Sequence, residues 1–297
     1  MENKIVNFGT IHQCNCYLGS PTLHPLVSVT DLSNVNTMRD SLKLDVYTIL
    51  LREHPCNDFS CGRQSHDYSN GTLQFLRPGQ TFNLGNDETS EQKGWILVFH
   101  PLLLQGTTLG QNIQNYTFFN YNPNEALHVS TREKQRVVEC LENIRKELLH
   151  AVDRHSKTLI SRHIELLLDY CTRFYERQFI TRCEANQKLM GKFEKLLDEY
   201  FESNHPKNTN FPSAKYYADH LQLSSRYFID LLKFETGKSI QEYTQFKRFN
   251  RAKQQLLTTD KPVSRIAEEL GYSSTPYFTR LFTKIVGYTP NTFRHSN

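Results

Sequence analysis

The chain has 297 residues, enough for two domains and a connecting segment. Hydrophobic residues make up 38% and charged residues 22%, which is typical of a soluble globular protein, and no apolar run approaches the ~18 residues that a membrane helix needs. Residues 1–5 lack the apolar stretch of a signal peptide, and the seven cysteines are irregularly spaced, as reduced thiols are. We therefore expect a cytoplasmic protein with no membrane partner.

The net charge of +4 is unevenly distributed along the chain. Residues 1–188 contain 19 Lys and Arg against 20 Asp and Glu, whereas residues 189–297 contain 16 against 11. A near-neutral first part followed by a basic second part indicates that only the second part meets a polyanion. This basic excess is modest, so a nucleic-acid partner has to be argued from sequence patterns as well.

The first part of the chain is expected to be mostly β structure. Residues 1–40 are polar and irregular, which predicts loops and short strands. Apolar runs with strand character then recur within residues 42–104, at 44–51, 72–76 and 95–99. They are separated by turn signals at Asn70-Gly71, a candidate hairpin turn, and at Pro78-Gly79. Several short strands at this spacing favour a small sandwich or barrel.

Residues 131–180 change to helical periodicity. Two apolar seams step by three and four residues, the first at Val137, Leu141, Ile144 and Leu148, the second at Ile160, Ile164, Leu167, Cys171 and Phe174. Such seams suit packing within the chain or a coiled coil between two subunits, and the pattern leaves both interpretations open. Beyond them, residues 189–201 are amphipathic and predict a further helix, which the polar break at 204–210 ends.

The last third of the chain contains one short pattern twice. Tyr-Phe, leucine and glycine recur fifty positions apart, at Tyr227-Phe228, Leu231 and Gly237 and again at Tyr277-Phe278, Leu281 and Gly287. In each copy a short apolar helix is followed by serines that can cap the next helix, and the glycine ends that helix. This pattern predicts two helix-turn-helix units, braced by a connecting helix at 240–257 that carries both an apolar stripe and the positive charges of Lys247, Arg248, Arg251 and Lys253.

The second helix of a helix-turn-helix enters the major groove with its N-terminal residues foremost. The side chains of the two second helices that lie off the apolar faces are therefore the candidate DNA-binding residues: Ser225, Arg226, Ile229, Asp230 and Lys233 in the first copy, and Thr275, Pro276, Thr279, Arg280 and Lys284 in the second. Arginine can bond guanine, aspartate can accept from cytosine, and threonine or isoleucine methyl groups can contact the thymine methyl. Lys233 and Lys284 lie further along their helices and are expected to hold phosphates.

Residues 189–295 resemble the DNA-binding domain of AraC/XylS-family transcription regulators. The resemblance is carried by Ala267-x2-Leu270-Gly271-Tyr272, Tyr277-Phe278-x-Arg280-x-Phe282, Gly287-Tyr288-Thr289-Pro290-x2-Phe293-Arg294, Ser225-Arg226-Tyr227-Phe228, Leu232-Lys233 and Glu235-Thr236-Gly237-Lys238-Ser239. It implies base-reading roles for Arg226, Asp230, Thr275, Pro276 and Arg280. Two positions depart from the family pattern: Gln222 replaces a glycine at the first turn, and Asp230 replaces a basic or neutral residue.

The family usually joins this domain to a small β-barrel that senses a ligand, and residues 94–101, 118–119 and 124–127 resemble the N-terminal half of a subgroup. Many barrels of this cupin type bind metal through a His-x-His pair, which this sequence lacks, so a cupin enzyme is disfavoured. Zinc-compatible residue types do occur at His54, Cys56, Cys61 and His66, in a spacing unlike that of a zinc finger. No nucleophile–base pair or phosphate-binding glycine loop is present in the sequence. We expect neither enzymatic activity nor a cofactor.

These observations predict an α+β protein in three parts: a cupin-like sensor barrel at residues 1–130, a helical dimerisation segment and linker at 131–188, and an all-α domain with two helix-turn-helix units at 189–297. The expected function is ligand-responsive, sequence-specific DNA binding that regulates transcription. The expected partners are double-stranded promoter DNA, a small-molecule effector and a second copy of the chain, with RNA polymerase as a further candidate. A metal- or redox-sensing regulator using the His54/Cys56/Cys61/His66 cluster, and a DNA binder without a ligand, are the alternatives.

Overall fold

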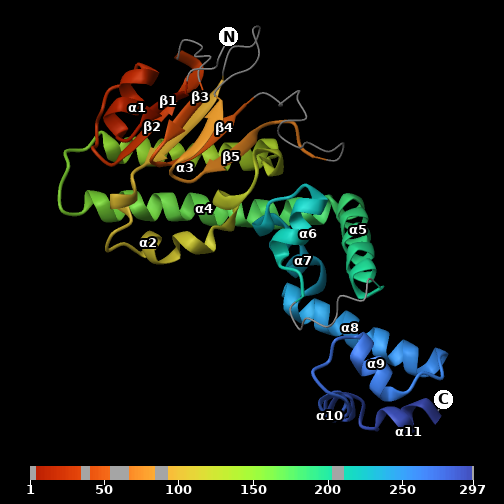
Figure 1. Ribbon diagram of the computed structural model, residues 1–297. Coiled ribbons are helices and arrows are strands. Elements are labelled where there is room, and N and C mark those ends of the chain that lie inside the picture. The colour runs from red at the N-terminus through yellow and green to blue at the C-terminus, as the bar shows by residue number, and fades with distance from the viewer. Residues whose placement is uncertain (1–4, 35–40, 54–66, 84–92, 203–210, 296–297) are drawn as a thin grey trace. The chain divides into compact units, whose positions relative to one another are not determined.

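A computed structural model describes residues 5–34, 41–53, 67–83, 93–202 and 211–295, and it divides into two compact units (Figure 1). Unit 1 comprises Met1–Cys183 and unit 2 comprises Glu184–Asn297. Unit 1 contains β-sheet and helices, and unit 2 is helical throughout its described residues. The protein is therefore of mixed α+β class, with its sheets in the N-terminal unit.

The strands of unit 1 form two sheets. They are β1 (Ile5–Phe8), β2 (Val27–Asp31), β3 (Ser41–Leu44), β4 (Tyr47–Arg52), β5 (Thr72–Leu76), β6 (Gln80–Asn83), β7 (Gly94–Phe99) and β8 (Leu127–His128). The smaller sheet has the order β1-β3-β6 and the larger the order β2-β7-β4-β5-β8, with only the β1–β3 pair parallel. Both sheets are open among the described strands, so the predicted closed barrel is not confirmed.

Two local predictions for these strands are wrong. The single strand expected at 44–51 is two strands, β3 and β4, which belong to different sheets. The Asp45 N–H still donates to the Phe8 carbonyl of the smaller sheet, and the chain bends at Asp45 and Val46 before β4 begins. Asn70-Gly71 is not a two-residue hairpin turn, since β5 follows it directly and pairs with β4. Gly71 instead lies where a Cβ atom would come within 3.3 Å of the Arg52 carbonyl oxygen.

The helices of unit 1 are α1 (Ile11–Leu18), α2 (Thr108–Asn112), α3 (Thr131–Leu148) and α4 (Ser156–Thr181). The sequence interpretation missed α1, although its signals are present: the Thr10 side chain caps its start and Gly19 ends it in the left-handed conformation, with φ 65°. Its apolar face, which includes Ile11, Cys14 and Leu18, packs into the core with residues of β3, β4 and β7. Three apolar positions over two turns were too few to reveal a helical period.

The two long helices α3 and α4 pack on each other along the predicted seams. Every seam residue is buried within the chain. A capping box between Ser130 and Glu133 fixes the start of α3. Of the two interpretations that the periodicity left open, packing within the chain is the one that uses these residues, so a dimer has to use other side chains.

The C-terminal end of α4 is attached to the larger sheet by buried polar groups. The Gln178 amide accepts from the His128 N–H at 2.7 Å and donates to the Ala126 carbonyl at 3.0 Å. Arg182, directly after the helix, forms an ion pair with Asp67, whose side chain is fully buried. These contacts hold the last residues of unit 1 firmly in that unit.

Unit 2 is built from α5 (Cys183–Glu202), α6 (Ala214–Leu221), α7 (Ser225–Thr236), α8 (Ile240–Thr258), α9 (Val263–Glu269), α10 (Thr275–Val286) and α11 (Pro290–His295). One apolar core runs through these helices, with Phe193, Tyr217, Phe228, Phe278 and Phe282 among its fully buried side chains. Residues 183–188, which the sequence prediction assigned to a linker, form the first turns of α5.

Candidate DNA interface

Two helix pairs of unit 2, α6–α7 and α9–α10, have the same turn construction. In the first, the Gln222 N–H donates to the Asp219 carbonyl and the Leu223 N–H to the Ala218 carbonyl. In the second, the matching bonds run from Gly271 to Glu268 and from Tyr272 to Ala267. Both are Schellman motifs, which satisfy the last carbonyls of a helix and turn the chain sharply.

The offset between the two copies of the repeat is not the same at every position. The bonded carbonyls at the turns belong to Ala218 and Ala267, which lie 49 positions apart, whereas the capping residues of the second helices, Ser224 and Ser274, lie 50 apart. The turn of the second pair is therefore one residue longer. Both alanines are buried, and each has only a methyl group at this position, which allows close approach of the two helices.

Gln222 occupies the left-handed position of the first turn. Its φ of 58° and ψ of 36° correspond to the φ of 71° that Gly271 adopts in the second turn. Among the described residues, Gln222 is the one non-glycine with positive φ. The departure from glycine noted in the sequence is thus accommodated by strain, with the backbone shape unchanged.

The second helices, α7 and α10, begin and end alike. The Ser224 and Ser274 side chains accept from the backbone N–H groups of Tyr227 and Tyr277, as predicted. Gly237 and Gly287 end the helices in the left-handed conformation. Each helix therefore has a defined first turn, with its backbone dipole positive at that end.

All ten predicted DNA-binding residues lie on these two helices and none is buried. The exposed ones are Arg226, Lys233, Pro276, Arg280 and Lys284, and the half-buried ones are Ser225, Ile229, Asp230, Thr275 and Thr279. Within each helix they recur in adjacent pairs four residues apart, followed by a lysine one turn later, which places them on one face. The opposite faces carry the core residues Phe228 and Leu232 in α7 and Phe278 and Phe282 in α10.

The two exposed faces differ in charge pairing. In α7 the Arg226 guanidinium lies 3.8 Å from the Asp230 carboxylate, one helical turn away. In α10, within the described residues, Arg280 forms no ion pair. An exposed pair of this kind is weak, so it orients Arg226 without preventing it from contacting another acceptor.

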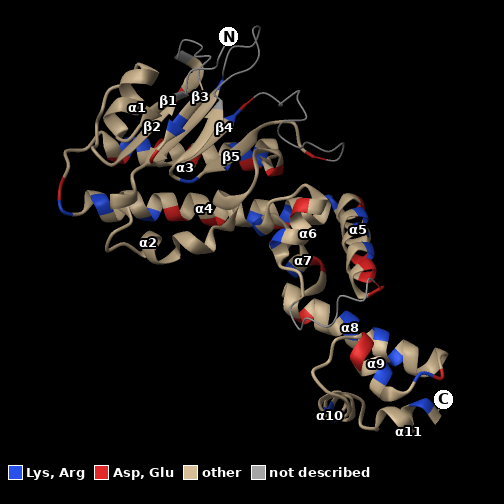
Figure 2. Cartoon of the chain, viewed as in Figure 1, with Lys and Arg blue, Asp and Glu red and all other residues tan. Residues whose placement is uncertain are grey.

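The basic residues of α8, coloured blue in Figure 2, mostly form contacts inside unit 2. Lys247 pairs with Glu194 at 2.7 Å, and Arg251 pairs with Asp198 at 3.0 Å and Glu202 at 2.9 Å, which joins α8 to α5. Arg248 is buried. The basic side chains left exposed on the two second helices are therefore those best placed for a polyanion.

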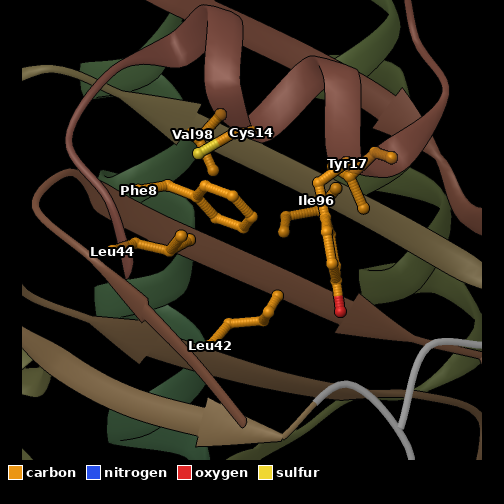
Figure 3. A pocket seen from close by; sticks show the side chains of 8 residues that line it. Phe8, Cys14, Tyr17, Leu42, Leu44, Ile96 and Val98 are labelled. Carbon is orange, nitrogen blue, oxygen red and sulfur yellow. The ribbon is translucent and has the colours of Figure 1, made fainter. Parts of the chain in front are cut away.

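Unit 1 contains an apolar pocket between α1, the smaller sheet and β7 (Figure 3). Its cavity volume is about 10 Å³, room for about one water molecule. It is lined by Phe8, Cys14, Tyr17, Leu18, Leu42, Leu44, Ile96 and Val98. Burial raises the pKa of the Cys14 thiol to about 11, so this sulfur is an apolar wall atom at neutral pH. This pocket could not be predicted from sequence patterns, because its lining comes from segments up to ninety residues apart.

The predicted metal-ligand types at His54, Cys56, Cys61 and His66 lie outside the described residues. Within the ranges that the structure describes, no group of three or more His, Cys, Asp or Glu could hold a metal ion. Over the same ranges, none of the helices has the length and apolar character to cross a membrane.

Comparison with known proteins defines the class of unit 2. The family described as "Helix-turn-helix domain" matches residues 217–296. The regulatory protein SoxS of Salmonella typhimurium is 33% identical over 111 residues, which cover 37% of this chain and 97% of that protein. The arabinose operon regulatory protein of Escherichia coli is 29% identical over 136 residues, 45% of each chain. An AraC-type regulator structure from Chromobacterium violaceum is 26% identical with a TM-score of 0.32, covering 37% of this chain and 93% of that one.

Unit 2 is thus a helix-turn-helix DNA-binding domain. The chain belongs to the AraC/XylS family of transcriptional regulators. The match covers between 21% and 45% of the length of three other curated relatives, so it does not extend over the whole of those proteins.

Proposed function

We propose that this protein regulates transcription by binding promoter DNA with two helix-turn-helix units, placing α7 and α10 in consecutive major-groove segments. The observation that carries the proposal is the shared construction of the two helix pairs, with the same turn bonds, the same serine caps and an exposed polar face on each second helix. Major-groove segments on one side of a duplex recur about every 34 Å, so each protomer reads two neighbouring boxes.

The residue types on the two faces support different base preferences. Arg226 and Arg280 each offer the two-pronged donor geometry that suits guanine. Asp230 can accept from a cytosine amino group or repel bases that present only acceptors. Thr275, Pro276 and Thr279 offer mainly apolar contact, and Ser225 and Ile229 complete the first face. Because the two sets differ, we expect two non-identical boxes.

The lysines on these helices have a separate role. Lys233 and Lys284 lie near the C-terminal ends of α7 and α10, about one turn beyond the last readers Asp230 and Arg280, and both are exposed. At that distance from the groove floor they bind phosphates, which contributes affinity without sequence preference.

The direct test is selection of bound duplexes from a random DNA pool by the full chain. Our proposal predicts an enriched site with two different boxes whose centres are about 10 base pairs apart. Enrichment of a single box, or of no defined sequence, would show that the two helix pairs are not two readers.

A second proposal concerns residues 1–130, which we propose to be a sensor for a small-molecule effector. The resemblance of residues 94–101, 118–119 and 124–127 to a subgroup of sensor domains supports this proposal. The apolar pocket beneath α1 has room for about one water molecule, so an effector that binds there has to move its lining apart. An effector acts on DNA binding only if it binds two states of the protein unequally. DNA affinity measured for the full chain with and without candidate apolar compounds tests this.

A DNA binder without a ligand and a metal or redox sensor remain the competing functions, and elemental analysis of the purified chain separates out a metal sensor.

Residues 131–188 are proposed to support a homodimer, with residues 189–297 as the DNA-binding domain. Since the predicted seams are buried within the chain, the supporting surface is the exposed part of α4, where Leu159 and Leu166 lie seven residues apart and are 43% and 45% exposed. Sedimentation of the full chain distinguishes monomer from dimer. We also propose that the protein acts in the cytoplasm and contacts RNA polymerase at the promoter.

A further inference from the structure

The buried face of α8 contains a charged side chain at its midpoint. Five buried residues follow one another at four-residue spacing along this helix: Ile240, Thr244, Arg248, Ala252 and Leu256. Arg248 is only 7% exposed. The regular spacing predicts an apolar residue here, so a guanidinium at this position requires a physical reason.

Hydrogen bonding does not supply that reason. Within the described residues, Arg248 has no carboxylate partner, and its Nε and Nη2 atoms are buried without hydrogen-bond acceptors. Its Nη1 donates to the Gln245 amide oxygen at 3.4 Å, a long bond. An arginine buried in this way is costly unless another interaction offsets the lost hydration.

Two aromatic rings provide the offsetting contact. The Arg248 guanidinium carbon lies 3.6 Å from the centre of the Tyr272 ring and 5.3 Å from the centre of the Phe211 ring. Both distances are within the range of cation–π attraction, which strengthens when the cation is desolvated. The ring faces thus replace the water that the guanidinium has lost.

The two rings come from different halves of unit 2. Phe211 precedes α6 and packs against Tyr200 and Phe201 of α5, with ring centres 6.0 and 5.9 Å away. Tyr272 lies in the turn before α10 and contacts Phe278 of that helix at 4.7 Å. A single side chain of the connecting helix therefore contacts the turn of the second helix pair and a ring that packs on α5 just before the first pair.

We propose that Arg248 is a positioning residue that fixes α10 relative to α7, and so sets the spacing between the two DNA boxes that the protein accepts. This inference rests on the proposed two-reader function. A planar, permanently charged guanidinium suits the role because it holds two ring faces at once, whereas an apolar side chain of equal length would fill the space without constraining the angle.

The chain offers matched variants for a test. Arg248→Met keeps the length and removes the charge, and Tyr272→Leu removes the ring. Tyr272→Phe keeps the ring and is expected to behave as wild type. Arg251→Met is the control on the same helix. Within the described residues, the contacts of that arginine are with α5, where it pairs with Asp198 and Glu202 and lies over the Phe201 ring.

The measurement is the affinity of the full chain for two kinds of duplex. The first kind carries the selected two-box site with the spacer between the boxes changed by up to two base pairs. The second carries the first box alone. Wild type, Tyr272→Phe and Arg251→Met should all lose affinity steeply, about tenfold or more, when the spacer changes by one base pair. Arg248→Met and Tyr272→Leu should bind the best spacing about ten- to thirtyfold more weakly, as loss of a desolvated cation–π contact predicts. Their affinities should then vary by less than about threefold across the series, with single-box binding unchanged.

A steep spacer dependence in Arg248→Met, or an equal loss on every duplex including the single box, overturns the positioning role. If Arg248→Met does not fold by circular dichroism, the difference between Tyr272→Leu and Tyr272→Phe decides the question in the same way. Failure of wild type to prefer two boxes over one is a different result, since it removes the two-reader function itself before any variant is compared.

Discussion

The strained turn residue Gln222 allows the equivalence of the two helix pairs to be tested through stability. It holds the left-handed conformation that Gly271 holds in the second turn. Replacing it by glycine should stabilise unit 2, because glycine adopts this conformation without the clash that a Cβ causes. The reverse change at the matching position, Gly271→Gln, should destabilise the same unit.

The magnitude follows from two opposing effects. A non-glycine residue in the left-handed region costs about 1–2 kcal/mol, which Gln222→Gly recovers. Glycine also makes the unfolded chain more flexible, which costs about 0.4–1 kcal/mol. The expected net gain is about 0.5–1 kcal/mol, and with a urea dependence of about 2 kcal/mol per molar the unfolding midpoint rises by about 0.4 M.

The assay is urea unfolding of the full chain, followed by two signals. Trp95 is the only tryptophan in the sequence and lies buried in β7, so its fluorescence reports on unit 1. Circular dichroism reports on the helices of both units. Gln222→Gly should shift the helical transition and leave the Trp95 transition unchanged. An unchanged or lowered helical midpoint would refute the argument that the first turn is a strained form of the second.

Three further predictions concern other contacts of the chain. Lys284→Ala should weaken binding to all DNA sequences alike and lower the slope of log affinity against log salt by about one, as titrations at several salt concentrations would reveal; a sequence-dependent loss would make it a base reader. Asp67→Asn should destabilise unit 1 by about 3–5 kcal/mol, since it removes the negative charge that faces the buried Arg182 guanidinium, and the Trp95 transition measures this; a loss below about 1 kcal/mol would mean that the buried pair adds little to stability. The hydrogen bond from Lys261, together with Arg265, lowers the pKa of the Glu269 carboxyl from its ordinary 4.5. The ionised carboxylate therefore stabilises the fold above pH 4.5, and this stabilisation is lost as the pH falls through the lowered pKa. Glu269→Gln should make the stability of unit 2 depend less on pH in this window, and an unaltered acid-unfolding profile would contradict the coupling.

The DNA-binding unit could be predicted closely from the sequence because its signals are local. Serine caps, left-handed glycines and a helical apolar period act over a few residues, and they placed α7, α8 and α10 to within one residue. The ten candidate contact residues followed from the same periodicity, since positions opposite a buried face must be exposed. Their contacts with DNA stay a prediction.

Unit 1 was harder to predict because its structure depends on contacts between distant segments. The break between β3 and β4 is made by partners in different sheets, which a continuous apolar run cannot reveal. The burial of Arg248 was not predicted either, because it depends on the contact of α8 with Phe211 and Tyr272, which come from distant parts of the sequence. The longer second turn was hidden by the constant offset of the Tyr-Phe pairs.

Selection from a random DNA pool with two arginine variants shows whether one protomer reads two DNA boxes with two helices. Arg226→Ala should abolish base preference at one position of one box, at a cost of about 1–3 kcal/mol, and leave the other box intact. Arg280→Ala should do the same in the other box. Loss of preference at the same base pairs in both variants, or wild-type preference in both, would show that α7 and α10 do not read separate boxes.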